Sequence, residues 1–130
     1  MKTIKYRVWA KVNECYLDME ADYFYLAPDG TFYEITQLRN GEIDYNEVRA
    51  DIQFYTGLKD RNNKEIYEGD IVKLYDIRYT KPLIGKVCFN TERGRWMIYQ
   101  NVSQGRDLTA EKASKCEIVG NIYENSELLK

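Results

Sequence analysis

The chain has 130 residues, of which 44% are hydrophobic and 31% charged, with a formal net charge of −2 at pH 7. This length and composition predict that residues 1–130 form a single globular domain, large enough to bury a core without disulfides or metals. Histidine is absent, which excludes Ser-His and Cys-His nucleophilic pairs and imidazole metal sites.

The sequence predicts a cytoplasmic location. No apolar run reaches the ~20 residues that a membrane helix needs, and the first residues alternate basic and apolar types, unlike a signal peptide. The three cysteines, Cys15, Cys88 and Cys116, form no CxxC pair. Cys88 and Cys116 lie in apolar runs, so we expect both thiols to be buried.

The first part of the chain reads as short strands separated by turns. Ile4, Tyr6 and Val8 alternate with basic residues, a pattern typical of a half-buried strand. Further strands are expected at residues 14–19, 22–26 and 31–38, with turns at Pro28-Asp29-Gly30 and Asn40-Gly41. Residues 44–52 are ambiguous, and one interpretation is a short helix capped by Asp44 with Glu47 three positions later.

The second part continues in the same way, with Gly69-Asp70 opening a buried strand and Arg93-Gly94 at the bend of a hairpin. The expected strands are 54–59, 65–67, 71–75, 85–91, 95–99 and 117–123, and the expected helical turns are 109–115 and 126–129. The pattern therefore predicts an all-β fold, either a partly open β-barrel or a β-sandwich of short strands, with one or two short helical turns.

Three ordered blocks carry a resemblance to a known family. They are Lys5–Ala10 (KYRVWA), Gln53–Lys73 (QFYTGLKDRNNKEIYEGDIVK) and Glu117–Leu129 (EIVGNIYENSELL). Together they resemble the YopX family of small proteins, which phages and prophages of Gram-positive bacteria encode. The resemblance implies a β-barrel-like domain, and it supplies no catalytic residue.

Charge is unevenly distributed along the chain. Residues 13–56 contain ten acidic and two basic side chains, whereas residues 57–106 contain ten basic and six acidic ones. Such asymmetry can mark a surface that faces a partner.

The basic segment allows two interpretations. Its cations could form one face with Tyr75, Tyr79 and Trp96 and bind single-stranded nucleic acid, with aromatic rings stacking on bases. Alternatively it pairs with the acidic segment and Trp96 is core, which the sequence pI near 5.3 favours. The cations concerned are Lys73, Arg78, Lys81, Lys86, Arg93 and Arg95.

Acidic residues raise two further alternatives. The first is a surface that imitates nucleic-acid phosphates, set against a plain solvated face; its residues would be Glu14, Asp18, Glu20, Asp22, Asp29 and Glu34. The second is a carboxylate-based metal protein or enzyme built from Asp60, Glu65, Glu68 and Asp70. Against it, Asp60 and Asp70 have evident roles in turns.

The sequence thus favours a non-catalytic binding or regulatory module that acts through protein–protein contacts and needs no cofactor and no membrane. The partner would be another protein or a second copy of the chain, and nucleic acid is the alternative. Candidate contact residues are Tyr75, Tyr79, Arg93, Arg95, Trp96 and Tyr99. We assign Trp9, Ile71, Val72, Val87, Phe89, Ile118 and Ile122 to the core.

Overall fold

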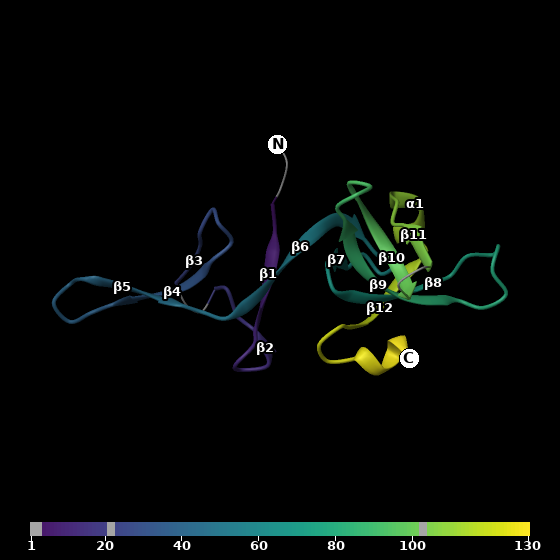
Figure 1. The fold of residues 1–130 in the computed structure, drawn as a ribbon. Helices are drawn as coiled ribbons and strands as arrows, with labels where there is room; N and C mark the ends of the chain where they lie inside the picture. Colours follow the sequence, from purple (N-terminus) through teal and green to yellow (C-terminus); the bar gives the residue numbers. More distant parts are fainter. Residues whose placement is uncertain (1–3, 21–22, 102–103) are drawn as a thin grey trace. The chain divides into compact units, whose positions relative to one another are not determined.

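The computed structural model describes residues 4–20, 23–101 and 104–130 (Figure 1), and most of them lie in short strands. This confirms the prediction of an all-β fold. The chain separates into two compact units, and we describe each by itself. The N-terminal unit is Tyr6–Gln53, and the barrel unit consists of Met1–Lys5 together with Phe54–Lys130.

The N-terminal unit contains two groups of antiparallel strands. In the first, β1 lies between β2 and the beginning of β6, and in the second the order is β3-β4-β5. The bounds are β1 Tyr6–Ala10, β2 Cys15–Tyr16, β3 Phe24–Leu26, β4 Phe32–Gln37, β5 Ile43–Glu47 and β6 Ala50–Lys59. Part of the strand predicted at 22–26 lies outside the described residues, and the strand predicted at 14–19 is reduced to β2.

A small core holds the first group of strands together. Val8, Trp9 and Ala10 of β1 are buried, which confirms the assignment of Trp9 to the core. The Trp9 ring meets the Tyr16 ring edge-on, with the centroids 5.1 Å apart. The buried Gln53 side chain accepts hydrogen bonds from Arg7 Nε and the Tyr16 hydroxyl, both at 2.8 Å, so its polar oxygen is satisfied.

The helical interpretation of residues 44–52 is wrong, because this segment forms β5 and the start of β6. The Asn40-Gly41 turn explains why this segment is a strand and not a helix. There the amide of Leu38 donates to the carbonyl of Glu42 at 2.7 Å, which turns the chain back on β4 directly before Ile43. Asp44 then lies opposite Thr36 in the strand ladder, so it caps no helix.

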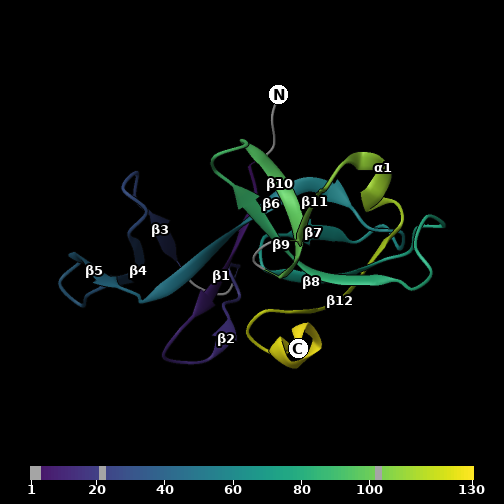
Figure 2. The ribbon, with the colours of Figure 1, turned by 45° about the vertical axis from the view of Figure 1, so that its right-hand side comes forward.

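The barrel unit is built on one five-stranded antiparallel sheet in the order β11-β10-β9-β8-β12, with β7 paired to the end of β6. The sheet curls into a partial barrel (Figure 2). The bounds are β7 Glu65–Tyr67, β8 Asp70–Leu74, β9 Leu83–Asn90, β10 Arg95–Asn101, β11 Gln104–Asp107, α1 Ala110–Ala113, β12 Cys116–Asn121 and the 3-10 helix Ser126–Leu129.

Both predicted helical turns are present, and Thr109 caps α1 by accepting a hydrogen bond from the Lys112 amide. Strand β11 was not predicted. Its sequence, Gln-Gly-Arg-Asp, has no alternating apolar residues, and the strand exists because its backbone pairs with β10.

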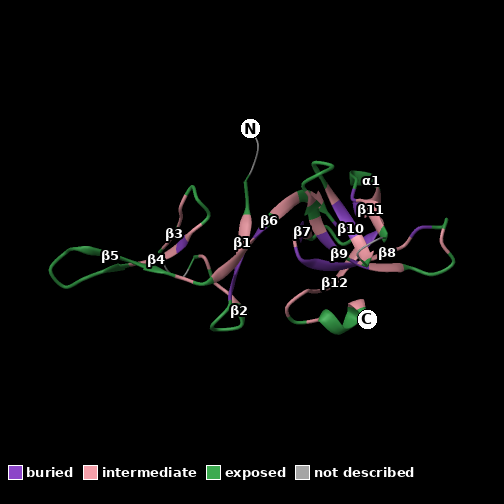
Figure 3. Cartoon of the chain, viewed as in Figure 1, coloured by how far each residue is buried: buried purple, intermediate pink, exposed green. Residues whose placement is uncertain are grey.

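The core of the barrel unit is formed by side chains from the strands and from α1. Figure 3 colours the buried positions on the strands purple. Its buried members are Ile66, Val72, Leu74, Val87, Ile98, Leu108, Ala113 and Cys116. Burial raises the pKa of the Cys116 thiol to about 12, in accord with the predicted buried cysteine, whereas Cys88 is half-buried.

Most of the predicted core residues are placed correctly. Ile71, Val72 and Val87 are buried, and Ile118 and Ile122 are half-buried. Phe89 is an error, because 42% of it is exposed. It lies near the end of β9, opposite Trp96 in the ladder, and the two rings meet edge-to-face with their centroids 5.2 Å apart.

The motif around Gly69 and Asp70 makes the sharp connection between β7 and β8. Gly69 has a φ of +84°, which other residues adopt only with strain, and its amide donates to the carbonyl of Val87 at 2.8 Å. The buried Asp70 carboxylate accepts from the Tyr67 amide at 2.7 Å. The motif therefore fixes where β8 enters the sheet.

The carboxylate of Asp60, only 5% exposed, joins two distant parts of the barrel unit. Its Oδ1 accepts from the amides of Asn62 and Lys64 at 2.8 and 2.9 Å, which shapes the turn after β6. Its Oδ2 accepts from the amide of Ile118 in β12 at 3.0 Å. One side chain thus satisfies three backbone N–H groups.

We expect Asp60→Ala to lower the free energy of unfolding of the barrel unit by about 3 kcal/mol, because three backbone N–H groups lose their common acceptor. Urea unfolding followed by fluorescence tests this in a Trp9→Phe background, where Trp96 alone reports on the barrel unit. Glu92→Ala removes an exposed carboxylate of the same unit and should change stability by less than about 0.5 kcal/mol. Equal effects of the two substitutions would contradict this role for Asp60.

Candidate interaction surface

The predicted contact residues of β10 do not share a face. Side chains alternate along a strand, so Trp96 points to the same side as Ile98, toward the barrel core. Arg95 and Tyr99 point to the opposite side, where they lie across the ladder from Asn90 and Lys86. The expected combination of cations and an exposed tryptophan on one surface is therefore not formed by this strand.

Tyr75 and Tyr79 already have cations on their rings. The guanidinium of Arg61 lies 4.7 Å from the centroid of the Tyr75 ring, and that of Arg106 lies 4.8 Å from the centroid of the Tyr79 ring. Tyr79 also packs against the barrel core. These contacts stabilise the barrel unit itself, and each places a guanidinium against one face of the ring, where a nucleic-acid base can then not stack.

Two of the predicted basic residues have acidic partners nearby. Arg95 forms an ion pair with Asp107 at 2.8 Å, and Arg78 donates from Nε to both oxygens of Asp76 at 3.0 and 3.1 Å. The hydrogen bonds from Arg78 hold the pKa of the Asp76 carboxyl well below its usual range. Arg93 is exposed in the β9–β10 turn.

Three of the four carboxylates considered for a metal site are used in other ways. Asp60 and Asp70 accept backbone hydrogen bonds, and Glu65 pairs with Lys5 at 2.9 Å. Among the residues that the structure describes, no group of three or more acidic or cysteine side chains is arranged to hold a metal ion.

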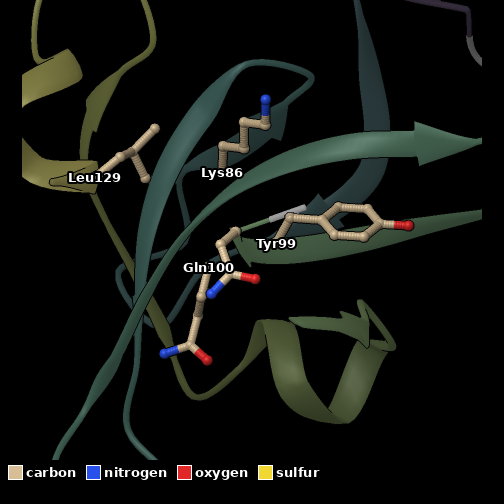
Figure 4. Close-up of a pocket in the computed structure, with 5 residues that line it drawn as sticks. Lys86, Tyr99, Gln100 and Leu129 are labelled. Atoms are coloured by element: carbon tan, nitrogen blue, oxygen red, sulfur yellow. The ribbon is translucent and has the colours of Figure 1, made fainter. Parts of the chain in front are cut away.

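A pocket of about 410 Å³ lies in the barrel unit beside the predicted residue Tyr99. Figure 4 shows that Lys86, Tyr99 and Gln100 point in different directions, not toward a common centre. The Tyr99 hydroxyl accepts from Asn90 Nδ2 at 2.6 Å and donates to Met97 Sδ at 3.3 Å. Its ring lies over Gly105, where a Cβ atom would come within 2.5 Å of the ring. Tyr99 therefore has a packing role at this site.

The strongest candidate surface lies in the N-terminal unit, on one side of the β3-β4-β5 sheet. We call it the tyrosine face and define it as Tyr23, Tyr25, Tyr33, Ile35, Ile43 and Tyr45. The register places Tyr25 opposite Tyr33 and Ile35 opposite Tyr45, so these side chains project from the same side of the three strands.

The rings on this face contact one another directly. Tyr25 and Tyr33 stack with their centroids 6.3 Å apart, and Tyr45 meets both edge-on at 6.4 and 6.3 Å. The face is nevertheless open: Tyr23 is 81% exposed, Ile43 57% and Tyr45 55% (Figure 3 shows β5 exposed along its length). An exposed apolar cluster of this kind is a mark of an interaction site.

The opposite side of the same sheet is different. Phe32, on β4, is only 2% exposed and stacks on Phe24 with the centroids 5.2 Å apart. The Phe24–Phe32 pair is therefore the buried contact on this side, although Glu34, Asp44 and Asn46 on the same side are exposed. The rings of the tyrosine face are separate from this contact.

Acidic side chains surround the tyrosine face. The N-terminal unit contains ten acidic and four basic residues, for a net charge of −6. Glu47 lies on the face, opposite Tyr33, while Glu42 and Asp44 belong to the same hairpin. None of these three carboxylates is in an ion pair with a residue that the structure describes.

None of the contact residues predicted from the sequence lies on the tyrosine face, because all of them belong to the basic segment 57–106. The sequence nevertheless contains a signal for this face. The Pro28-Asp29-Gly30 and Asn40-Gly41 turns fix the register of three strands, and alternation then places the tyrosines on one side.

Comparison with known families is informative over nearly the whole chain. The family model described as YopX protein matches residues 5–130, which include both units. The chain belongs to the YopX family.

Solved structures agree with this assignment at the level of the fold. The crystal structure of YopX from Bacillus subtilis is 21% identical and superimposes with a TM-score of 0.66, covering 100% of each chain. The crystal structure of protein EF1440 from Enterococcus faecalis is 23% identical, with a TM-score of 0.56, and 98% of this chain and 99% of that one are covered.

A search of curated proteins gave no match to this YopX-family chain. Among its described residues, no helix is long and apolar enough to cross a membrane.

If the tyrosine face is a contact surface and not part of the core, Tyr45→Ala should lower the unfolding free energy of the N-terminal unit by less than about 1 kcal/mol. Phe32→Ala, which removes the buried ring on the opposite side of the sheet, should lower it by about 3–5 kcal/mol. A Trp96→Phe background leaves Trp9 as the reporter of this unit in urea unfolding. A similar large loss for both substitutions would assign Tyr45 a structural role.

The Asp76–Arg78 pair should make stability depend on pH. Because the pKa of Asp76 is lowered from 3.8, the pair stabilises the fold above that pH and loses its effect as the pH falls through the depressed pKa. Wild type should therefore exceed Asp76→Asn in urea midpoint by a constant margin near neutrality, and the margin should shrink below pH 3.8. Glu92→Gln serves as the exposed control, and a margin that widens on acidification would contradict the assignment.

Proposed function

We propose that this YopX-family protein is a non-catalytic binding or regulatory module and that the tyrosine face is its protein-contact surface. The observation that supports the proposal is the cluster of mutually contacting, exposed rings on a sheet whose other side holds the buried Phe32. Tyrosine combines a large apolar ring with a polar hydroxyl, and protein interfaces are enriched in it.

Charge favours a protein over a nucleic acid as the partner of this face. The net charge of −6 on the N-terminal unit would repel phosphates, which single-strand binders attract with cations. In the barrel unit, the rings of Tyr75 and Tyr79 are covered by the chain's own guanidinium groups.

We further propose that the protein is phage- or prophage-encoded and acts in the bacterial cytoplasm. Membership of the YopX family supports the first part. The second is supported by the three cysteines, each of which carries a free thiol, as is usual in a reducing compartment.

Site-specific photo-crosslinking in bacterial cells tests the contact surface. A benzoylphenylalanine at position 45 lies on the tyrosine face, and one at position 44 lies on the same strand but on the opposite side of the sheet. We expect protein conjugates from position 45 that persist after nuclease treatment, and far fewer from position 44. Both positions are exposed, so accessibility alone cannot produce the difference.

Equal crosslinking from the two positions, or conjugates that nuclease removes, would count against the proposal. A conjugate with a second copy of the chain would support a protein-contact surface used for self-association.

A further inference from the structure

The β3-β4-β5 sheet ends in a strand with an open edge. Strand β5 pairs with β4 on one side and with no described strand on the other. The hydrogen bonds of the hairpin identify which backbone groups are directed outward. Glu42 accepts from Leu38, and Val48 donates to Phe32, so the even-numbered residues of the strand bond to β4.

It follows that Ile43, Tyr45 and Glu47 direct their N–H and C=O groups away from β4, toward the open edge. The side chains of the same three residues lie on the side of the tyrosine face. An added strand would therefore form backbone hydrogen bonds with these residues, and every second one of its side chains would lie beside the tyrosine rings.

The charge of the edge selects the kind of strand that can be added. Glu42, Asp44 and Glu47 carry three carboxylates on or next to β5, and none is neutralised by a described residue. A second copy of β5 would add the same three carboxylates to this edge, and such an accumulation of like charge opposes pairing. A basic strand would be attracted instead.

The chain itself shows how its tyrosine rings receive cations. Arg7 lies 4.5 Å from the centroid of the Tyr16 ring, and Arg61 and Arg106 lie in the same way over Tyr75 and Tyr79. Guanidinium groups stack on aromatic rings and bind carboxylates through two hydrogen bonds, so Tyr45 beside Glu47 offers both interactions.

We propose that the open edge of β5 binds an extended, arginine- or lysine-bearing segment of a partner protein as an added strand. Its cationic side chains at alternate positions contact the tyrosine face and Glu47. This inference rests on the proposed function, since it specifies the partner chemistry of the same surface.

The test measures binding of labelled peptides to the full-length protein by fluorescence anisotropy. The probe is a short peptide in which arginine and threonine alternate. One control peptide has the same composition with all arginines in one block, and another carries N-methyl groups on the backbone amides that would face β5. We expect the alternating peptide to bind at least about tenfold more tightly than either control.

Variants of the protein then separate the surface from its overall charge. Glu47→Lys and Asp44→Lys make the same change of charge on neighbouring parts of β5, but on opposite sides of the sheet. We expect Glu47→Lys and Tyr45→Ser each to weaken binding about tenfold, and Asp44→Lys to weaken it about threefold or less. Circular dichroism and the thermal unfolding midpoint verify that each variant is folded.

Equal weakening by Glu47→Lys and Asp44→Lys, or unchanged affinity for the N-methylated peptide, would overturn the added-strand model. The model would also be overturned if sedimentation detected an oligomer that Ile43→Pro dissociates. In that case β5 would pair with a second copy of the chain. If crosslinking from position 45 captures a protein while the basic peptide does not bind, the proposed function stands and this inference fails. If neither occurs, both fail.

Discussion

The buried carboxylate of Asp60 connects two segments of the barrel unit that lie far apart in the sequence. Asp60 holds the turn after β6 in shape and at the same time accepts the amide of Ile118, 58 residues further along the chain. The neighbouring amide of Arg61 donates to the carbonyl of Cys116 at 2.8 Å, so the turn and β12 are joined at two places. Because the curled sheet ends at β12, this connection determines how the sheet closes around its core.

Much of this fold is predictable from local sequence. The turns at Asn40-Gly41 and Arg93-Gly94, the strand opened by Gly69-Asp70 and the cap at Thr109 all use residues with a specific backbone or hydrogen-bonding preference. What local sequence does not contain is the pairing between distant segments. Strand β11 exists through its backbone contacts with β10, and the exposure of Phe89 depends on where the barrel core ends.

The candidate site, like the fold, is predictable from local sequence only in part. The excess of tyrosine indicates an interaction surface in general terms, but composition does not distinguish the partly buried rings of Tyr75 and Tyr79 from the open rings of Tyr25 and Tyr45. The distinction depends on which cations lie nearby in three dimensions and on which side of a sheet each ring projects. Both become known only when the register of the strands is known.

The long separation between Asp60 and Ile118 also has a consequence for synthesis on the ribosome. The N-terminal unit is complete in sequence once Gln53 has emerged, and its β3-β4-β5 sheet pairs strands that follow one another directly in the chain. The barrel unit lacks its last strand, β12, until Asn121 has left the exit tunnel, so the edge of β8 that β12 covers stays unpaired during the intervening translation. All three strands of the acidic tyrosine face are therefore available for pairing before most of the basic residues of the chain have been synthesised.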